Sequence, residues 1–432
     1  MHSASTDQPV LPSARAVALD TLGKVLRHRL ALDDAFDPVG LDDRDRAFVR
    51  RLVTVTLRRL GQIDALIAHC LHRPLPAKAG TVQDILRLGV CQLVFLATPP
   101  HAAVDTAVGL ARAAGLAGHA KLVNAVLRRL SRDGGALAAR QDAARLNTPE
   151  WLWQAWTATY GAPVTEAIAM AHLAEPPLDI TAKADAALWA DRLQAEILPG
   201  SSLRRQSGGQ VTALPGYAEG AWWVQDAAAA LPARLFGDVA GLAIADLCAA
   251  PGGKTAQLAA AGARVTAVDR SPDRLKRLSD NLVRLGLDAR LVAADAAAWQ
   301  ADQTFDGVLL DAPCSATGTL RRHPDAAWLK QPDDVARLAL AQDRLLKAAL
   351  ALLKPGGTLI YCTCSLQAEE GVGRIEPLLA ADAGLRRRPI AAAEVGGLAE
   401  LITSAGDLRS LPCHLADKGG MDAFYACRLH TA

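Results

Sequence analysis

Two cysteines occur in motifs whose residue types suit nucleophilic chemistry. Cys314 lies in DAPCSATGTLRRHPD (Asp311 to Asp325), just after an acid that ends an apolar run, and Cys364 lies in a similar setting in YCTCS (Tyr361 to Ser365). A free thiol with a pKa of about 8.5 is only a few per cent ionised at neutral pH, so a nucleophilic cysteine needs help from its surroundings. A loop at the carboxyl edge of a sheet, near helix N-termini, provides such help. Both cysteines qualify by position, so spacing alone does not decide which thiol attacks.

A second motif predicts a ligand-binding turn. DLCAAPGGKT (Asp246 to Thr255) follows an apolar run and opens a helical pattern. Its glycines allow backbone to approach a ligand closely, and the helix N-terminus offers N–H groups to an anion such as a carboxylate. A Walker phosphate loop would require glycine where Cys248 stands, which excludes a P-loop NTPase. The residues predicted to contact a cofactor here are Cys248, Ala249, Ala250, Pro251, Gly252, Gly253 and Lys254.

Acids end three further apolar runs downstream of this turn. Asp269 lies where nucleotide-binding sheets place the carboxylate that binds both ribose hydroxyls, Asp295 can lie beside an adenine amine, and Asp311 ends the next run. One such acid alone is a weak signal, because Asp commonly starts loops and caps helices. Three of them in register with one glycine turn favour an adenosyl ligand.

The elements that position these residues form an alternating pattern. After residue 236, short apolar runs alternate with helical segments, which predicts an α/β domain: a Rossmann-like, doubly wound parallel sheet over residues 236–432. Ligands of such sheets bind beyond the carboxyl ends of the strands, where the acids fall. The runs are LAIAD, VTAVD, LVAAD, FDGVLLD and TLIYCT, and AFYACRL reads as a further strand, antiparallel to them.

The rest of the chain divides into three parts. We expect a flexible N-terminus over residues 1–12, an all-α domain over 13–138 and a small α+β segment over 145–235. Apolar residues at helical spacing, such as Val104, Ala107, Val108 and Ala111, support the helical domain. Asp133-Gly134-Gly135 predicts the end of its last helix and the start of a linker.

Composition excludes several classes of protein. Lys and Arg number 47 against 45 Asp and Glu, so no global basic field marks the chain, and an RNA partner must be argued from local clusters. The eight cysteines are scattered, contain no C-x-x-C pair and do not resemble a disulfide framework. We expect no metal site, no membrane span and no signal peptide. A cytoplasmic monomer is the resulting expectation.

The motifs DLCAAPGGKT, DAPCSATGTLRRHPD and YCTCS together resemble the signatures of the RNA cytosine-C5 methyltransferases, which use S-adenosylmethionine. The helical region before them resembles the NusB-like RNA-binding module fused to the bacterial Sun/RsmB branch of that family. The resemblance covers nearly the whole chain. It implies S-adenosylmethionine as cofactor, small-subunit (16S) rRNA as partner, and C5 of a cytosine as the methylated position.

The resemblance also implies roles for individual residues. Cys364, in the Thr-Cys-Ser motif, is expected to attack C6 of the cytosine, and Cys314 is expected to assist resolution of the adduct and product release. Asp311 is expected to face the target base. Lys254 is expected either to orient cofactor or base, or equally to pair with a neighbouring acid. Cys362 is interpreted as a packing residue, because further metal ligands are lacking nearby in the sequence.

Basic residues near Cys314 and in the α+β segment predict where the RNA is contacted. The target base must leave its stack, which favours single-stranded or loop RNA. Arg321, Arg322 and His323 follow Cys314 closely enough to contact neighbouring phosphates. The segment PPLDITAK departs from the Arg-x-Asn pattern often found in relatives, with Lys183 as the replacement. Transfer RNA is an alternative substrate for the same chemistry, and a non-catalytic RNA-binding assembly factor is an alternative of another class.

Overall fold

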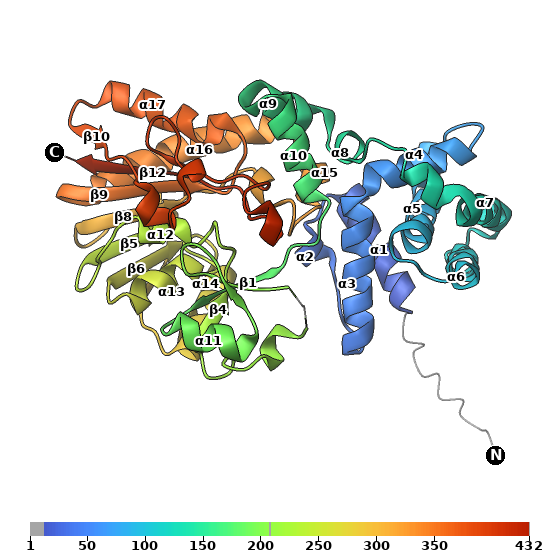
Figure 1. Cartoon of the computed structure of the whole chain (residues 1–432), viewed down its shortest axis with the longest axis horizontal. Helices are drawn as coiled ribbons and strands as arrows, with labels where there is room; N and C mark the ends of the chain where they lie inside the picture. The colour runs from blue at the N-terminus through green and yellow to red at the C-terminus, as the bar shows by residue number, and fades with distance from the viewer. Residues whose placement is uncertain (1–12, 207–208, 432) are drawn as a thin grey trace, which may run out of the picture. The chain divides into compact units, whose positions relative to one another are not determined.

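A computed structural model describes residues 13–206 and 209–431, and this part of the chain forms two compact units (Figure 1). The first unit holds the residues up to Gln154 together with His323–Leu329, and the second holds Ala155–Arg322 and the chain from Lys330 onward. The predicted flexible N-terminus, residues 1–12, lies outside the described residues.

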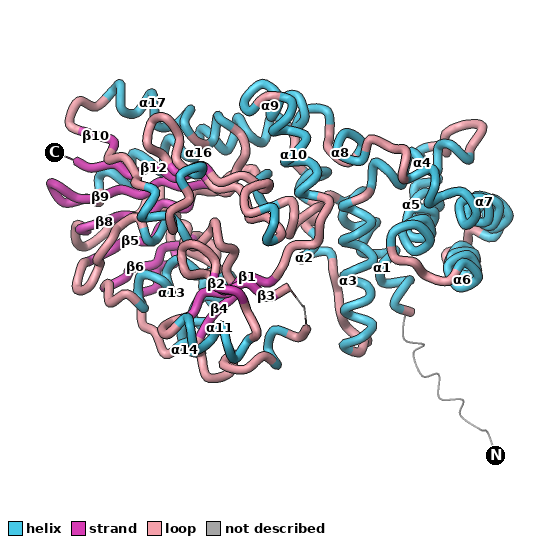
Figure 2. Tube along the Cα trace, in the orientation of Figure 1, coloured by secondary structure: helices cyan, strands magenta, loops and turns pink. Residues whose placement is uncertain are grey.

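The first unit is built from helices, as Figure 2 shows by colour. Each helix buries one apolar stripe; Leu22, Leu52, Ile63, Val82 and Leu127 all lie in one shared core. The prediction of an all-α N-terminal region is confirmed. The helices are α1 (Ala14–His28), α2 (Leu32–Ala35), α3 (Asp43–Arg58), α4 (Leu60–Cys70), α5 (Gly80–Val90), α6 (Pro100–Ala113), α7 (Ala120–Ala138), α8 (Ala143–Leu146), α15 (Ala326–Leu329) and the first half of α9 (Glu150–Tyr160).

The glycine pair that predicts a linker lies inside a helix. α7 continues through Gly134 and Gly135 to Ala138, so the predicted helix end at Asp133 is wrong. Gly134 is buried, and a Cβ at this position would lie 3.0 Å from the Val94 side chain. Close packing, rather than a chain break, therefore accounts for Gly134.

The helical unit includes His323–Leu329, a segment that begins inside the Cys314 motif. The indole N–H of Trp328 donates to the Leu57 carbonyl at 2.9 Å, and the buried Asp325 carboxylate accepts the N–H of Leu32 at 3.0 Å. Trp328 and Leu329 also pack against the helical core. The segment of the motif from His323 onward thus belongs structurally to the helical unit.

The second unit begins with a small α+β part. Its sheet has the order β2-β3-β1-β4, with every pair antiparallel. Ile180, Leu203 and Trp222 pack beneath it against Leu193. The elements are α10 (Ala162–His172), β1 (Leu178–Ala182), α11 (Ala186–Leu193), β2 (Glu196–Ile197), β3 (Leu203–Arg205), β4 (Trp222–Val224) and α12 (Leu231–Arg234).

The larger sheet of this unit has the order β10-β12-β9-β8-β5-β6-β7, with β11 pairing β12. Strands β9 to β7 in this order are parallel, and β12 pairs with β9 antiparallel. The order reverses at β5, between β8 and β6, where doubly wound sheets bind ligands. The strands are β5 (Ala243–Leu247), β6 (Arg264–Asp269), β7 (Arg290–Ala293), β8 (Phe305–Asp311), β9 (Leu353–Thr363), β10 (Leu385–Arg387), β11 (Leu408–Arg409) and β12 (Tyr425–Thr431).

Helices cover both faces of this sheet (Figure 1). Leu309 of β8 points into a core shared with α12 and α13, whereas Val308 and Leu310 point into a core shared with α16 and α17. The predicted Rossmann-like class is confirmed. The helices of this region are α13 (Gly253–Ala260), α14 (Pro272–Leu285), α16 (Pro332–Ala351) and α17 (Val372–Ala381). Across both described stretches, no helix has the length and apolar character needed to cross a bilayer.

Candidate active site

The two motif cysteines lie just beyond the carboxyl ends of neighbouring parallel strands. β8 ends at Asp311 and β9 at Thr363, and Asp311 is the register partner of Cys362. The loops that follow therefore start side by side, and they bring the Sγ atoms of Cys314 and Cys364 to 3.4 Å from each other. Both thiols can consequently reach one reacting group.

The surroundings of Cys314 favour its neutral thiol. The hydrogen bond with Cys364, burial and the nearby Cys364 and Glu370 raise the pKa of Cys314 well above its ordinary value, and the Ala316 N–H offsets only part of this rise. The thiolate, not the thiol, is the nucleophilic form, so a cysteine that keeps its proton is a poor nucleophile. Cys314 is thus poorly suited to act as the nucleophile.

A buried ion pair lies beside the cysteines. The ammonium of Lys254 lies 2.7 Å from the Asp311 carboxylate and 4.8 Å from the centre of the Phe424 ring. Burial by itself lowers the pKa of Lys254, but the Asp311 charge outweighs it and raises the pKa above its ordinary value. Lys254 is therefore charged, and of the two predicted alternatives for this residue the structure contains the pairing with a neighbouring acid. The side chain of Asp311 remains 32% exposed, so one part of it can face a ligand.

The glycine turn is shaped by contacts that only glycine allows. Gly252 has φ of 102°, and a Cβ there would lie 2.6 Å from Cγ of Leu278. Cys248 has φ of 60°, and burial raises its pKa to about 12, which leaves a neutral, inert thiol. α13 begins at Gly253, so the turn presents the start of this helix at the switch point of the sheet.

Two acids hold this turn in place. The buried Asp246 accepts the Thr255 hydroxyl at 2.5 Å, and burial raises the pKa of Asp246 to about 7. The buried Asp269 accepts the N–H of Ala250 at 3.2 Å and that of Ser271 at 3.0 Å. Asp269, the last residue of β6, therefore stabilises the glycine turn through its bond to Ala250.

The predicted cofactor residues come together at one edge of the sheet. The turn from Cys248 to Gly253 follows β5, Asp269 ends β6, Asp311 ends β8, and the exposed Asp295 lies two residues beyond the end of β7. The glycine turn, the helix start and the acids on adjacent strand ends match the needs of an adenosyl ligand with an amino-acid tail. S-adenosylmethionine therefore fits the residues present.

Arg321 does not present its guanidinium to solvent. The side chain is 1% exposed and donates to the Gly419 carbonyl at 2.5 Å and to Asp226 at 3.2 Å. Its burial contradicts the prediction of a phosphate contact, because desolvated Arg side chains held by protein acceptors serve packing and ion pairing instead. Arg322 is 38% exposed and forms an ion pair with Asp422, so its charge is already partly neutralised.

The other two predicted RNA contacts belong to different units of the chain. His323 is half-buried and belongs to the helical unit. Lys183 is exposed and follows β1, and its ammonium donates to the Leu285 carbonyl at 2.7 Å. The described side-chain hydrogen bond of Lys183 therefore goes to Leu285 and not to the cysteine loops.

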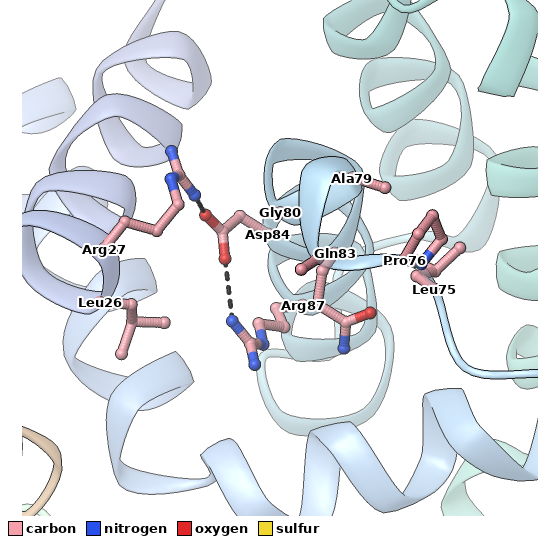
Figure 3. Close-up of a pocket in the computed structure, with 10 residues that line it drawn as sticks. Leu26, Arg27, Leu75, Pro76, Ala79, Gly80, Gln83, Asp84 and Arg87 are labelled. Atoms are coloured by element: carbon pink, nitrogen blue, oxygen red, sulfur yellow. Dashed lines mark hydrogen bonds and ion pairs between the residues drawn. The ribbon is translucent and has the colours of Figure 1, made fainter.

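A pocket of about 240 Å³ lies in the helical unit, and none of these residues lines it (Figure 3). Asp84 is buried in its wall between Arg27 and Arg87, with Arg87 at 2.9 Å, and Arg87 also pairs with Asp64 at 2.7 Å. The charges of the pocket are thus satisfied within the protein. Among residues 13–206 and 209–431, no cluster of three His, Cys, Asp or Glu side chains could hold a metal ion.

Several residues of the site are not predicted by the motifs. Asp246 ends an apolar run, as the other acids do, but no role is predicted for it from the sequence. Phe424 and Glu370 have no sequence signal of a site residue. Glu370 lies five positions after Ser365 and accepts hydrogen bonds from serines of both cysteine loops. Tertiary contacts alone identify it.

The fold and the site define an S-adenosylmethionine-dependent methyltransferase. Residues 238–430 match the family model described as 16S rRNA methyltransferase RsmB/F, and residues 12–132 match the NusB family. The chain is 39% identical over 445 residues to ribosomal RNA small subunit methyltransferase B of Pseudomonas putida, with 98% of each chain covered. The protein of the same name from Pseudomonas syringae pv. tomato is 38% identical, with 98% of this chain and 96% of that one covered. This chain belongs to the RsmB/F methyltransferase family.

Solved structures share the fold. The crystal structure of PH0851 superposes with a TM-score of 0.76 at 21% identity and covers 98% of this chain and 99% of that chain. A methyltransferase homolog protein from Pyrococcus horikoshii gives a TM-score of 0.56 at 24% identity, with 67% of this chain and 98% of that chain covered. Both likenesses agree with the Rossmann-like architecture.

Proposed function

We propose that this protein transfers the methyl group of S-adenosylmethionine to C5 of a cytosine in small-subunit rRNA, through a covalent bond between Cys364 and C6 of the base. Family membership supports an rRNA methyltransferase, since relatives at 38–39% identity over nearly their full length carry the name ribosomal RNA small subunit methyltransferase B. The match of residues 12–132 to the NusB family supports an RNA partner.

The thiol pair is the observation that carries the choice of C5 and of a covalent route. Methylation at a ring nitrogen or an amino group needs no cysteine, because those atoms carry a lone pair. Carbon C5 does not, and it becomes nucleophilic only after a thiolate has added to C6. Two thiols 3.4 Å apart, next to an ion pair at the methyltransferase edge of the sheet, match this requirement.

The proposed reaction has four steps at the base. The Cys364 thiolate adds to C6, and the electrons of the C5–C6 bond move toward N3 and O2. C5 would then bond to the methyl group that a bound sulfonium cofactor supplies, and the carbon–sulfur bond would break to leave a neutral thioether. A base removes the proton from C5, and re-formation of the C5–C6 double bond expels Cys364 as thiolate. The ring regains its aromatic character with one methyl group added.

The other residues have supporting roles in this proposal. Asp311 faces the N3 and N4 edge of the cytosine, and Lys254 holds the Asp311 carboxylate at 2.7 Å and balances its charge. Cys314, whose pKa is raised by its contact with Cys364 and by burial, keeps a proton that it can deliver as the Cys364–C6 bond breaks. Cys364 attacks, and Cys314 assists release.

Transfer of labelled methyl groups tests the proposal. Purified protein is incubated with labelled S-adenosylmethionine and either unmodified small-subunit rRNA or transfer RNA, and the labelled nucleosides are separated. We expect 5-methylcytidine from small-subunit rRNA alone. Cys364→Ala should abolish the label, while Cys413→Ser, a control at a half-buried thiol outside the cysteine motifs, should retain it. Label in transfer RNA only would overturn the substrate, and label on a nitrogen would overturn the chemistry.

A further inference from the structure

A buried carboxylate joins the two cysteine loops. Glu370, in a short turn after β9, is 0% exposed. Its carboxylate accepts the Ser315 N–H at 2.9 Å, the Ser315 hydroxyl and the Ser365 hydroxyl at 2.6 Å. It also accepts the side-chain amide of Gln342, from α16, at 3.2 Å.

The serines held by Glu370 are the immediate neighbours of the two cysteines. Ser315 follows Cys314, and Ser365 follows Cys364. A single carboxylate that binds both serines therefore fixes the separation of the loops within one residue of each sulfur atom. The loops are also joined by the N–H of Gly318, which donates to the Cys364 carbonyl at 3.0 Å.

The charge of Glu370 is not balanced by a cation. All donors to its carboxylate are neutral hydroxyl, amide or peptide groups, and no ion pair in the described part of the chain includes Glu370. Burying a carboxylate costs several kcal/mol unless its hydrogen bonds are satisfied, and these four donors meet that need. A purely structural link between two loops could use a neutral amide at far lower cost.

We propose that Glu370 is a positioning residue that holds the Cys314 and Cys364 loops in register, so that the two thiols stay together for attack and product release. The proposal rests on the covalent mechanism proposed above, in which Cys364 attacks the base and Cys314 assists release. It adds a residue that positions both thiols. The titratable groups that face Cys314 are the Cys364 thiol, the Glu370 carboxylate and the Tyr361 phenol, which donates to the Glu370 carbonyl at 2.8 Å. Burial raises the pKa of the Glu370 carboxylate, and four hydrogen bonds from neutral donors work against that rise. The charge of Glu370 raises the pKa of Cys314 in addition to the larger effects of the Cys364 contact and burial.

The test compares the full-length variants Glu370→Gln and Glu369→Gln. Glu369 is exposed and adjacent, so it controls for loss of one negative charge from the same turn. Alkylation of Cys314 by iodoacetamide is followed against pH with peptide mass spectrometry, without RNA or cofactor. Glu370→Gln should move the midpoint for Cys314 to lower pH, and Glu369→Gln should leave it unchanged.

Turnover provides the second readout. With small-subunit rRNA, Glu370→Gln should lower kcat about 100-fold, as a shift of about 1 Å in a reacting group does, while KM for rRNA and for cofactor stays within about twofold. Ser365→Ala removes one bond to the Cys364 loop but leaves the charge, so it should lower kcat without moving the Cys314 midpoint. This variant preserves the test if Glu370→Gln does not fold.

The outcomes separate this inference from the proposed function. If wild type makes no 5-methylcytidine, the proposed function fails, whereas the alkylation midpoint of Cys314 still reports on Glu370. If wild type is active and Glu370→Gln behaves like Glu369→Gln in both assays, the inference is overturned and the proposed function stands. A lower midpoint with unchanged kcat overturns the role in turnover.

Discussion

The sulfur atoms of Cys314 and Cys364 lie 3.4 Å apart, although 50 positions separate them in the chain. The parallel pairing of β8 with β9 brings them together, because it ends both strands at the same edge of the sheet. Contact with Cys364 and burial raise the pKa of Cys314. Each of the following predictions concerns an element that maintains this arrangement.

Removing the ammonium of Lys254 should slow methyl transfer without unfolding the protein. Lys254→Met leaves the Asp311 carboxylate without its partner at 2.7 Å, so we expect a loss of about 10²- to 10³-fold in single-turnover rate. Lys276→Met, which removes a well-exposed ammonium of α14, is the control and should retain the wild-type rate. Equal rates for both variants would show that the Lys254–Asp311 pair does not support the reaction.

Gly252→Ala should weaken cofactor binding. A Cβ at this position would meet Leu278 at 2.6 Å and force the glycine turn away from α14. Gly241→Ala separates this clash from backbone strain, because Gly241 also has positive φ (75°) but nothing within 4 Å of its Cβ position. Gly241→Ala should cost about 1 kcal/mol of stability and leave cofactor affinity unchanged. Calorimetric titration with S-adenosylmethionine should give a raised Kd for Gly252→Ala alone.

The buried Asp246 should make stability depend on pH. Its pKa is raised to about 7 in the folded chain, against about 3.9 when unfolded, so the folded state binds more protons between these values. Its contribution to stability is therefore fully present below about pH 4 and is lost as the pH rises through 7. One unit of pKa shift corresponds to about 1.4 kcal/mol.

Asp246→Asn should remove this loss, since the amide stays neutral at every pH and can still accept the Thr255 hydroxyl. We expect the melting temperatures of wild type and variant to be similar near pH 4, with the variant increasingly the more stable up to about pH 7. Asp302→Asn, at an exposed carboxylate, is the control. A difference that does not change with pH would contradict the raised pKa of Asp246.

Asp325 should contribute to the stability of the helical unit. Its carboxylate is buried and accepts the N–H of Leu32 at the start of α2, so Asp325→Ala leaves a buried donor unsatisfied. A loss of about 1–3 kcal/mol is expected in urea unfolding. Asp105→Ala, at an exposed position on α6, should change stability by less than about 0.5 kcal/mol. If both substitutions have the same small effect, the contact does not hold His323–Leu329 on the helices.

The sequence was informative where a pattern is local. Strands that end at Asp269 and Asp311 are visible as apolar runs, and the glycine turn is visible as a motif, so the Rossmann-like sheet and the edge that carries the site could be predicted. The helical character of the N-terminal region followed from periodicity in the same way.

Prediction failed where a long-range contact decides the role of a residue. Gly134 has the local signal of a helix end, but packing against Val94 places it inside α7. Arg321 lies in the Cys314 motif and carries a charge, yet its ion pair with Asp226, 95 positions away, buries it. Glu370 has no motif of its own, because its role depends on serines contributed by two separate loops.

The covalent bond between Cys364 and RNA is the central claim, and a trapped adduct tests it most directly. Cys314→Ser protein is incubated with small-subunit rRNA and S-adenosylmethionine and run on a denaturing gel, beside wild type and the double variant Cys314→Ser/Cys364→Ala. The account predicts a protein–RNA band for Cys314→Ser that is absent from the double variant. An adduct that persists without Cys364, or one that forms in Cys364→Ala protein and disappears when Cys314 is also removed, would contradict it.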